Sequence, residues 1–189
     1  MFDFGEFPIL TTAHLTMRQV APEDADGMMR LFSDTRVLTY LNMEPMDTAE
    51  KASGFINWLR GGYERQEGLD WTIRTHAGEF VGMCGMYQWN KNDRRIDLGY
   101  HILPDLWGRG FATEAAHAML GWAFEALDLH RVQADCTDGN IGSERVLLKC
   151  GFTLEGIWRE SCWEHGRFVN IRQFGLLRRE YLKSDGEGG

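Results

Sequence analysis

The chain has 189 residues, enough for one domain to bury its own hydrophobic core without disulfide support. Its 20 Lys and Arg residues stand against 28 Asp and Glu residues, giving a net charge of −8 with no dense basic run. This balance argues against nucleic acid as the main partner and favours a cationic or amine ligand.

The first sixty-odd residues predict one strand followed by helices. Apolar and polar side chains alternate over 13–20, which indicates a strand. Pro22 then begins a helix, because its fixed φ suits the first helical turn. A second helix is expected over 48–65, with Asp47 or Thr48 as its N-cap.

The next segments read as an antiparallel meander of three strands. They cover 69–75, 79–89 and 94–103 and are joined by short polar turns. The middle segment carries apolar residues on both faces. We therefore expect it inside a sheet that is covered on both sides.

After Pro104 the apolar residues recur with helical period from Ala116 to Leu127. The remaining elements are a strand over 132–136, a short helix from Asn140 to Cys150 closed by Gly151, and strands over 152–159 and 167–177. This order predicts an α+β domain with a mixed sheet and a β-loop-α-β unit at its centre. We assign residues 1–183 to a single domain and 184–189 to a flexible tail.

The cysteines and the first residues bear on the compartment. The 4 cysteines are widely spaced without a CxxC pair, which is typical of reduced cytoplasmic thiols. The opening segment carries Asp3 and Glu6 where a secretory leader would be basic and then apolar, and no apolar run has membrane length. No His, Cys or carboxylate set has metal-ligand spacing. We expect a cytoplasmic protein that binds neither membrane nor metal.

A small-residue turn, Trp107-Gly108-Arg109-Gly110-Phe111-Ala112, separates the third meander strand from the long helix. Free N–H groups and the positive end of the helix dipole make such a turn a site for phosphate. A dinucleotide fingerprint would need a third glycine at Thr113, and a P-loop would need Gly-Lys-Ser/Thr; both are absent. A purely structural turn is the alternative.

These residues resemble the GNAT acetyltransferase superfamily, and most closely its RimJ/RimL-type branch of ribosomal-protein N-terminal acetyltransferases. The resemblance rests on ordered motifs: Asp97-Leu98-Gly99-Tyr100, Pro104 to Ala115, Leu129-His130-Arg131-Val132, Asn140 through Ser143 to Gly151-Phe152, Glu155-Gly156, and Leu176 to Tyr181. It implies an α+β GNAT fold with a splayed mixed sheet and helices on both faces. It also implies acetyl-CoA as the co-substrate and direct acetyl transfer to an amine.

The resemblance further implies where the coenzyme would bind. The pyrophosphate would lie on the turn made by Gly108, Arg109, Gly110, Phe111, Ala112 and Thr113. Ile102 and Leu103 would pair with the pantetheine arm, and an N–H there would polarise the acetyl carbonyl. Asn140 would cap its helix and reach the pantetheine, and Ser143 would lie near the coenzyme sulfur.

Acid and base assignments follow from the same resemblance. Ser143 is our candidate for the proton donor to the departing thiolate, and a hydroxyl that only satisfies the helix start is the alternative. Asp97 is our candidate for the general base, acting through water. Its alternative is a solvated carboxylate or an ion pair with Arg94 or Arg95. His101 alternates onto the same strand face and is a third candidate.

Glu160 is the second candidate for the base, because it should run beside the acceptor cleft. The position that would carry the branch's glutamate is Cys162 in this chain. We expect the acceptor to be a protein or peptide N-terminal α-amine, with a small-molecule amine such as a polyamine or an antibiotic as the main alternative. A silent acyl-CoA-binding regulatory module is the non-enzymatic alternative. Some of the 7 tryptophans could line a homodimer face.

Overall fold

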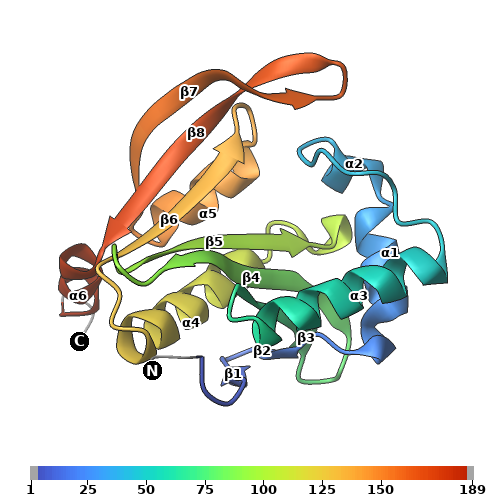
Figure 1. Cartoon of the computed structure of the whole chain (residues 1–189), viewed down its shortest axis with the longest axis horizontal. Helices are drawn as coiled ribbons and strands as arrows, with labels where there is room; N and C mark the ends of the chain where they lie inside the picture. Colours follow the sequence, from blue (N-terminus) through green and yellow to red (C-terminus); the bar gives the residue numbers. More distant parts are fainter. Residues whose placement is uncertain (1–3, 187–189) are drawn as a thin grey trace.

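The computed structural model describes residues 4–186 and, in the last helix, the side chains only as far as Leu182. These residues fold around one eight-stranded mixed sheet with the strand order β1-β2-β3-β4-β5-β6-β8-β7 (Figure 1). The strands are β1 (Leu10–Thr11), β2 (Leu15–Gln19), β3 (Gly68–Thr75), β4 (Phe80–Asn90), β5 (Arg95–Ile102), β6 (Arg131–Thr137), β7 (Thr153–Glu164) and β8 (Arg167–Leu177).

The sheet is splayed between β5 and β6. These two strands form the one parallel pair of the described sheet, and their register covers only Arg95–Asp97 against Arg131–Gln133. From Leu98 onward β5 has its partner β4 on one side and an open backbone edge on the other. The predicted mixed, splayed sheet is therefore confirmed, and the gap lies at the centre of the molecule (Figure 1).

Helices cover both faces, as predicted. One face packs against α1 (Ala25–Phe32), α2 (Thr35–Leu38) and α3 (Ala49–Glu64) through a core that includes Met28, Phe32, Ile56 and Met83. The other face packs against α4 (Phe111–Ala126) and α5 (Ile141–Lys149) through a larger core around Trp71 and Met119. The apolar stripe from Ala116 to Leu127 is buried in this second core because the helical period places it on one side of α4.

Some elements differ from the sequence prediction. The short β1 and the single turn α2 were not predicted, because neither carries a sustained period. The helix that Pro22 begins opens with a 3-10 turn, Pro22–Asp24, before α1. β7 runs past the predicted end at Arg159 because a bulge between Trp158 and Cys162 absorbs the irregularity and lets pairing resume.

The helix α6 (Arg178–Gly186) extends into the segment predicted as a tail. The last tail residues, 187–189, lie outside the described residues, so the boundary at 183 stays a prediction. Within residues 4–186, no helix combines the length and apolar character needed to cross a bilayer.

Candidate active site

The open edge of β5 offers backbone groups to a ligand at alternate residues. Leu103 N–H donates to the Val81 carbonyl, so the backbone of Leu103 faces β4. By strand alternation the N–H and C=O of Leu98, Tyr100 and Ile102 face the gap instead. The structure thus separates the two residues predicted to pair with pantetheine. Of these two residues, Ile102 is the one whose backbone N–H faces the gap.

Trp107 closes the far end of this edge. Its indole Nε1 donates to the Ile102 carbonyl at 2.8 Å, although half of the Trp107 side chain is exposed. The acceptor of Ile102 is therefore engaged by the protein itself. Its N–H stays available to a ligand oxygen in the gap.

The predicted phosphate turn begins the helix α4. Gly110 is the N-cap with φ of 86°, and Gly108 has φ of 76°. A Cβ added at either glycine would have no atom within 4 Å, so the space above the turn is open. No acceptor within residues 4–186 bonds the N–H groups of Phe111, Ala112 or Thr113. An open cradle of free donors at a helix N-terminus fits a pyrophosphate.

The acidic residue of this first turn is directed away from the cradle. Glu114 accepts hydrogen bonds from Thr12 Oγ1 and from the His14 N–H, the latter at 2.8 Å. These contacts tie α4 to the β1–β2 turn. They also hold the Glu114 carboxylate away from the N–H groups that would face an anion.

Two further predicted contacts, Arg109 and Phe111, border a cavity of about 330 Å³ beside the turn. The cavity is also lined by Leu103, by Arg30 of α1 and by Phe80 of β4. It lies on the α1 side of the turn. Arg109 therefore reaches a different surface from the one that the gap-facing edge of β5 presents.

The start of α5 closes the other side of the gap. Asn140 is the N-cap, and its Oδ1 accepts from the Ser143 N–H at 3.1 Å, which confirms the predicted capping role. The Ser143 hydroxyl is half-buried and lies 3.1 Å from the Tyr100 hydroxyl of β5. Sequence reasoning gave Tyr100 no role, because nothing in its strand indicates contact with a helix so distant in the chain.

Asp97 lies on the opposite face of β5, beside the point where the sheet splays. Its Oδ1 accepts from Gln133 Nε2 at 3.0 Å, and Arg95 Nη1 is 3.9 Å away. Burial raises the pKa of Asp97 above its usual value, although Gln133 and then Arg95 oppose the shift. The predicted ion pair with Arg95 is thus long, and Arg94 pairs with Asp128 instead. A carboxylate with a raised pKa is a better proton acceptor.

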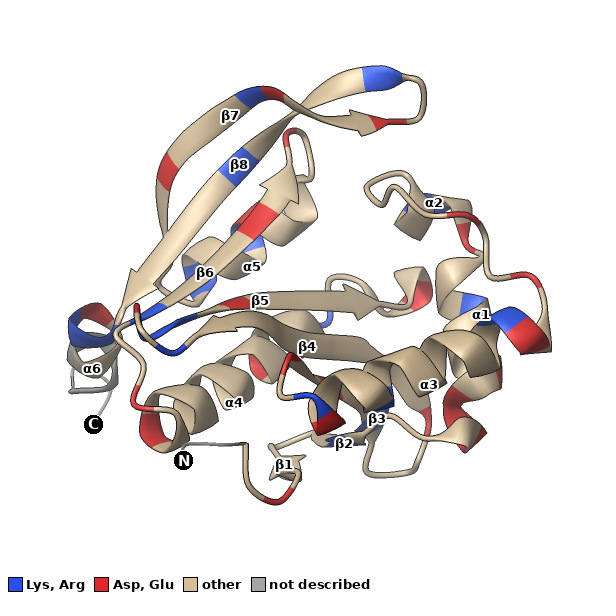
Figure 2. Cartoon of the chain, in the orientation of Figure 1, with Lys and Arg blue, Asp and Glu red and all other residues tan. Residues whose placement is uncertain are grey.

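Tyr87 and Asp135 extend this face, and neither was singled out from the sequence. Strand register places Tyr87 opposite Asp97, and Asp135 follows Gln133 on the same side of β6. The Tyr87 hydroxyl lies over Gly99, where a Cβ would approach it to 2.9 Å. Acidic residues thus mark both β5 and β6 near their divergence (Figure 2). Partial burial and the carboxylates of Asp135 and Asp97 raise the pKa of Tyr87, which keeps the phenol protonated.

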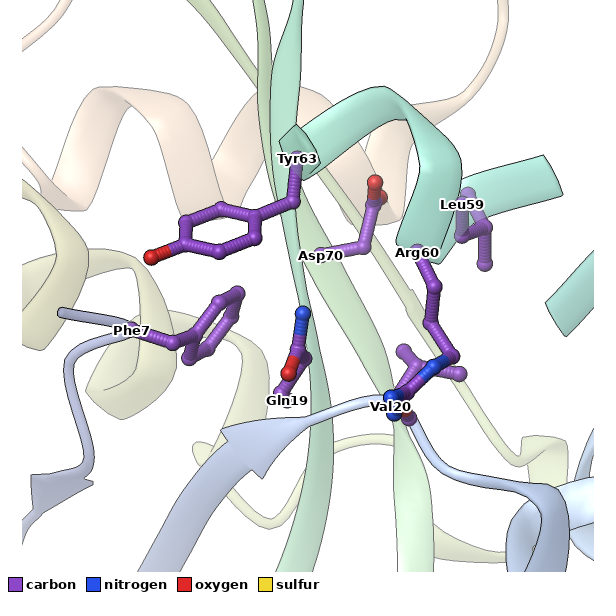
Figure 3. A pocket seen from close by; sticks show the side chains of 7 residues that line it. All are labelled: Phe7, Gln19, Val20, Leu59, Arg60, Tyr63 and Asp70. Atoms are coloured by element: carbon purple, nitrogen blue, oxygen red, sulfur yellow. The ribbon is translucent and has the colours of Figure 1, made fainter. Parts of the chain in front are cut away.

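Asp70 lies on the same sheet face but under α3 (Figure 3). Its carboxylate packs over Gly85, where a Cβ would lie 2.5 Å from Oδ1. Arg60 lines the same depression, yet its guanidinium donates to the Val20 carbonyl at 3.0 Å. Burial raises the pKa of Asp70 to about 7.

Asp70→Asn is expected to raise the melting temperature at pH 8 more than at pH 4. The unfolded carboxyl has a pKa of about 3.9, and the folded one about 7. Stability is therefore lost as pH rises from the first value to the second, and the full cost remains above it. Melting curves at both pH values measure this. Equal gains in melting temperature at the two pH values would contradict this expectation. Asp47→Asn is the control, because hydrogen bonding to Lys51 lowers the pKa of Asp47 and its loss should bring no gain at pH 8.

The other base candidates are placed less favourably. Glu160 lies on the exposed bulge of β7 with φ of 51°, and its N–H donates to Asn170. Strand register puts this position about 16 Å along β8 from the level of Asp97, at about 3.3 Å per residue. The two carboxylates therefore cannot act together on one amine. His101 packs edge-on against Phe32, and burial lowers its pKa to about 4, so it is neutral at pH 7.

The α1–α3 segment and the β7–β8 hairpin meet above the face that carries Asp97. His165 at the hairpin turn hydrogen-bonds the Leu38 carbonyl of α2 at 2.9 Å. The Tyr40 hydroxyl donates to the Gly139 carbonyl at 3.3 Å. These contacts bring α2 and the segment that follows it against the β7–β8 turn and the loop before α5. Among the described residues, no three His, Cys, Asp or Glu side chains are grouped so as to hold a metal.

Comparison with known proteins gives the same fold. A family model described as acetyltransferase (GNAT) domain matches residues 14–153. Over 173 residues the chain is 35% identical to a Bacillus subtilis (strain 168) protein named uncharacterized N-acetyltransferase YoaA, with 91% of this chain and 98% of that protein covered.

Two solved structures resemble it closely. Mycobacterium smegmatis RimJ in complex with CoA-disulfide superposes with a TM-score of 0.82 at 23% identity, over 95% of this chain and 94% of that one. A Vibrio cholerae spermidine N-acetyltransferase in complex with CoA and spermine gives a TM-score of 0.80 at 20% identity, over 90% of this chain and 99% of that one. At these identities the likeness establishes the fold alone. The acceptors of those two proteins are not carried over to this chain.

Proposed function

The chain belongs to the acetyltransferase (GNAT) family. We propose that it transfers the acetyl group of acetyl-CoA to the α-amine at the N-terminus of a peptide or protein. The observation that carries the proposal is the arrangement of donor and acceptor sides around one gap. Free N–H groups border the gap at the start of α4, and carboxylates lie on the opposite sheet face where β5 and β6 diverge.

On the donor side, the turn from Gly108 to Thr113 would hold the pyrophosphate, and the backbone edge of β5 would pair with the pantetheine arm. The open space over Gly108 and Gly110 supports the first contact. The gap-facing N–H of Ile102 would then donate to the acetyl oxygen as negative charge develops on it. Asn140 and Ser143 would approach the thioester from α5.

On the acceptor side, Asp97 is the proposed base. Acetyl transfer needs a neutral amine, so Asp97 takes the amine's proton through a water molecule. Because the carboxylate must be ionised, activity is expected to fall as pH drops through the raised pKa of Asp97. Asp135 and the protonated Tyr87 hydroxyl lie on the same face and would orient a cationic or hydrogen-bonding acceptor.

The pKa of the acceptor favours an α-amine over a lysine side chain. An α-amino group has a pKa of about 8 and a lysine about 10.4. Near neutral pH the former therefore loses its proton with less help. The net charge of −8 also favours basic N-terminal tails over acidic ones.

Intact-mass analysis of acetylated peptides tests the acceptor. Peptides with free N-termini and no lysine are compared with peptides blocked at the α-amine but carrying lysine, at equal concentrations with acetyl-CoA. We expect the free N-termini to be acetylated at least about tenfold faster, given the difference in pKa. Equal or faster acetylation of blocked lysine peptides would refute the preference. Faster reaction of spermidine than of any peptide would favour a small amine.

A further inference from the structure

The side chain of Tyr100 connects the coenzyme edge with the proposed proton donor. Strand alternation turns the backbone of Tyr100 toward the gap and its ring toward the α4–α5 face. There its Oη lies 3.1 Å from Ser143 Oγ and 3.1 Å from the Ser143 carbonyl oxygen. Tyr100 therefore touches the one side chain that we assign to the departing sulfur.

The direction of these hydrogen bonds follows from counting protons. A phenol carries one proton, so Tyr100 can donate fully to only one of the two oxygens. The Ser143 carbonyl can only accept, and Tyr100 lies within donating distance of it. Within α5 this carbonyl also accepts the N–H four residues on, and it keeps that bond when the Tyr100 proton turns to Ser143 Oγ. Ser143 Oγ has no other hydrogen-bond partner among the described residues, so its lone pairs are free to accept from Tyr100. Burial raises the pKa of Tyr100, so the phenol holds its proton at neutral pH.

We propose that Tyr100 is a positioning residue for acetyl transfer, whose hydroxyl donates to Ser143 Oγ and so turns the Ser143 proton toward the departing thiolate. The inference rests on the proposed function and on the assignment of Ser143. When Tyr100 instead donates to the Ser143 carbonyl and accepts from Ser143 Oγ, Ser143 spends its proton on Tyr100 and offers none to the sulfur. A hydroxyl that accepts one hydrogen bond also becomes a stronger donor in the next.

The proton balance of this step is complete. The amine nitrogen forms its bond to the acetyl carbon, and the carbon–sulfur bond breaks with its electron pair going to sulfur. Ser143 gives its proton to the thiolate and recovers one from bulk water. Asp97 takes the amine's proton through its water molecule and releases it to bulk water, which balances the proton that Ser143 recovers. Tyr100 keeps its proton throughout.

Tyr100→Phe removes only the hydroxyl and tests this role. We expect kcat to fall about three- to tenfold, the range of one lost hydrogen bond. KM for acetyl-CoA should stay within about twofold, because the ring and the backbone edge remain. In a Ser143→Ala background, Tyr100→Phe should lower kcat no further, because the two hydroxyls act as a unit. The readout is CoA release with whichever amine reacts fastest.

Tyr87→Phe is the matched control, because its hydroxyl lies on the other sheet face over Gly99. The fold losses in kcat of Tyr87→Phe and of Ser143→Ala should therefore multiply in the double variant. An unchanged kcat in Tyr100→Phe, or a loss that multiplies with Ser143→Ala, would overturn the proposal. If Ser143→Ala is impaired while Tyr100→Phe is not, only the role of Tyr100 fails. If the enzyme prefers another acceptor than an N-terminal α-amine, only the proposed function fails. The test of Tyr100 still stands, because CoA release can be followed with any amine that reacts.

Discussion

Gly110→Asp is expected to abolish acetyl-CoA binding while leaving the protein folded. Gly110 lies at the N-cap of α4 in the left-handed region, with open space where a Cβ would be placed. An aspartate there projects a negative charge into the pyrophosphate position. Two like charges about 4 Å apart repel by about 4 kcal/mol at an effective dielectric constant of about 20. We therefore expect the Kd to rise at least about hundredfold.

Gly110→Asn separates charge from shape. Asparagine tolerates the left-handed conformation about as well as aspartate does and adds a side chain of the same size. It should weaken binding less than aspartate by at least about tenfold. Titration calorimetry gives both affinities, and circular dichroism confirms the fold. Wild-type affinity in a folded Gly110→Asp protein would remove the proposed coenzyme site.

Ser143→Ala is expected to lower kcat by about ten- to a thousandfold, the range for lost acid catalysis. Its hydroxyl is half-buried beside Tyr100 at the first turn of α5, whereas the cap of that turn is made by Asn140 and the Ser143 backbone. Alanine keeps the backbone bond. The affinity for acetyl-CoA and the melting temperature should therefore change little.

Ser143→Thr is the control, because it keeps a hydroxyl at the same position. It should retain a substantial part of the wild-type kcat. Steady-state kinetics with the best acceptor measures both variants. A Ser143→Ala enzyme within twofold of wild type would show that the hydroxyl serves only the helix start.

Local sequence patterns predicted the phosphate turn correctly as a structural element. Gly108 and Gly110 adopt the positive φ values that glycine permits, and the helix follows directly. The Asn140 cap was also predicted, because a cap depends on residues only a few positions apart. The turn α2 was missed, since its four residues are too few to show a helical period, although Asp34 caps it.

The end of β5 shows what the resemblance left open about the two residues predicted to pair with pantetheine. The resemblance assigned both Ile102 and Leu103 to this role, because it located the strand end and not the direction of each backbone group. The pairing of Leu103 with Val81 fixes that direction. A shift of one residue in register would exchange the two. Register is set by the partner strand, which lies some twenty residues earlier in the chain.

The sequence by itself determined the fold class, the order of the main elements, the glycine turn at the start of α4 and the cap of α5. These features depend on periodicity and on backbone preferences over a few residues. Only the tertiary structure decided that Tyr100 meets Ser143 and that Asp97, Gln133 and Asp135 share one face beside the splay. Such contacts join residues 36 to 43 positions apart. They depend on how strands pair and where the pairing stops, which no local pattern records.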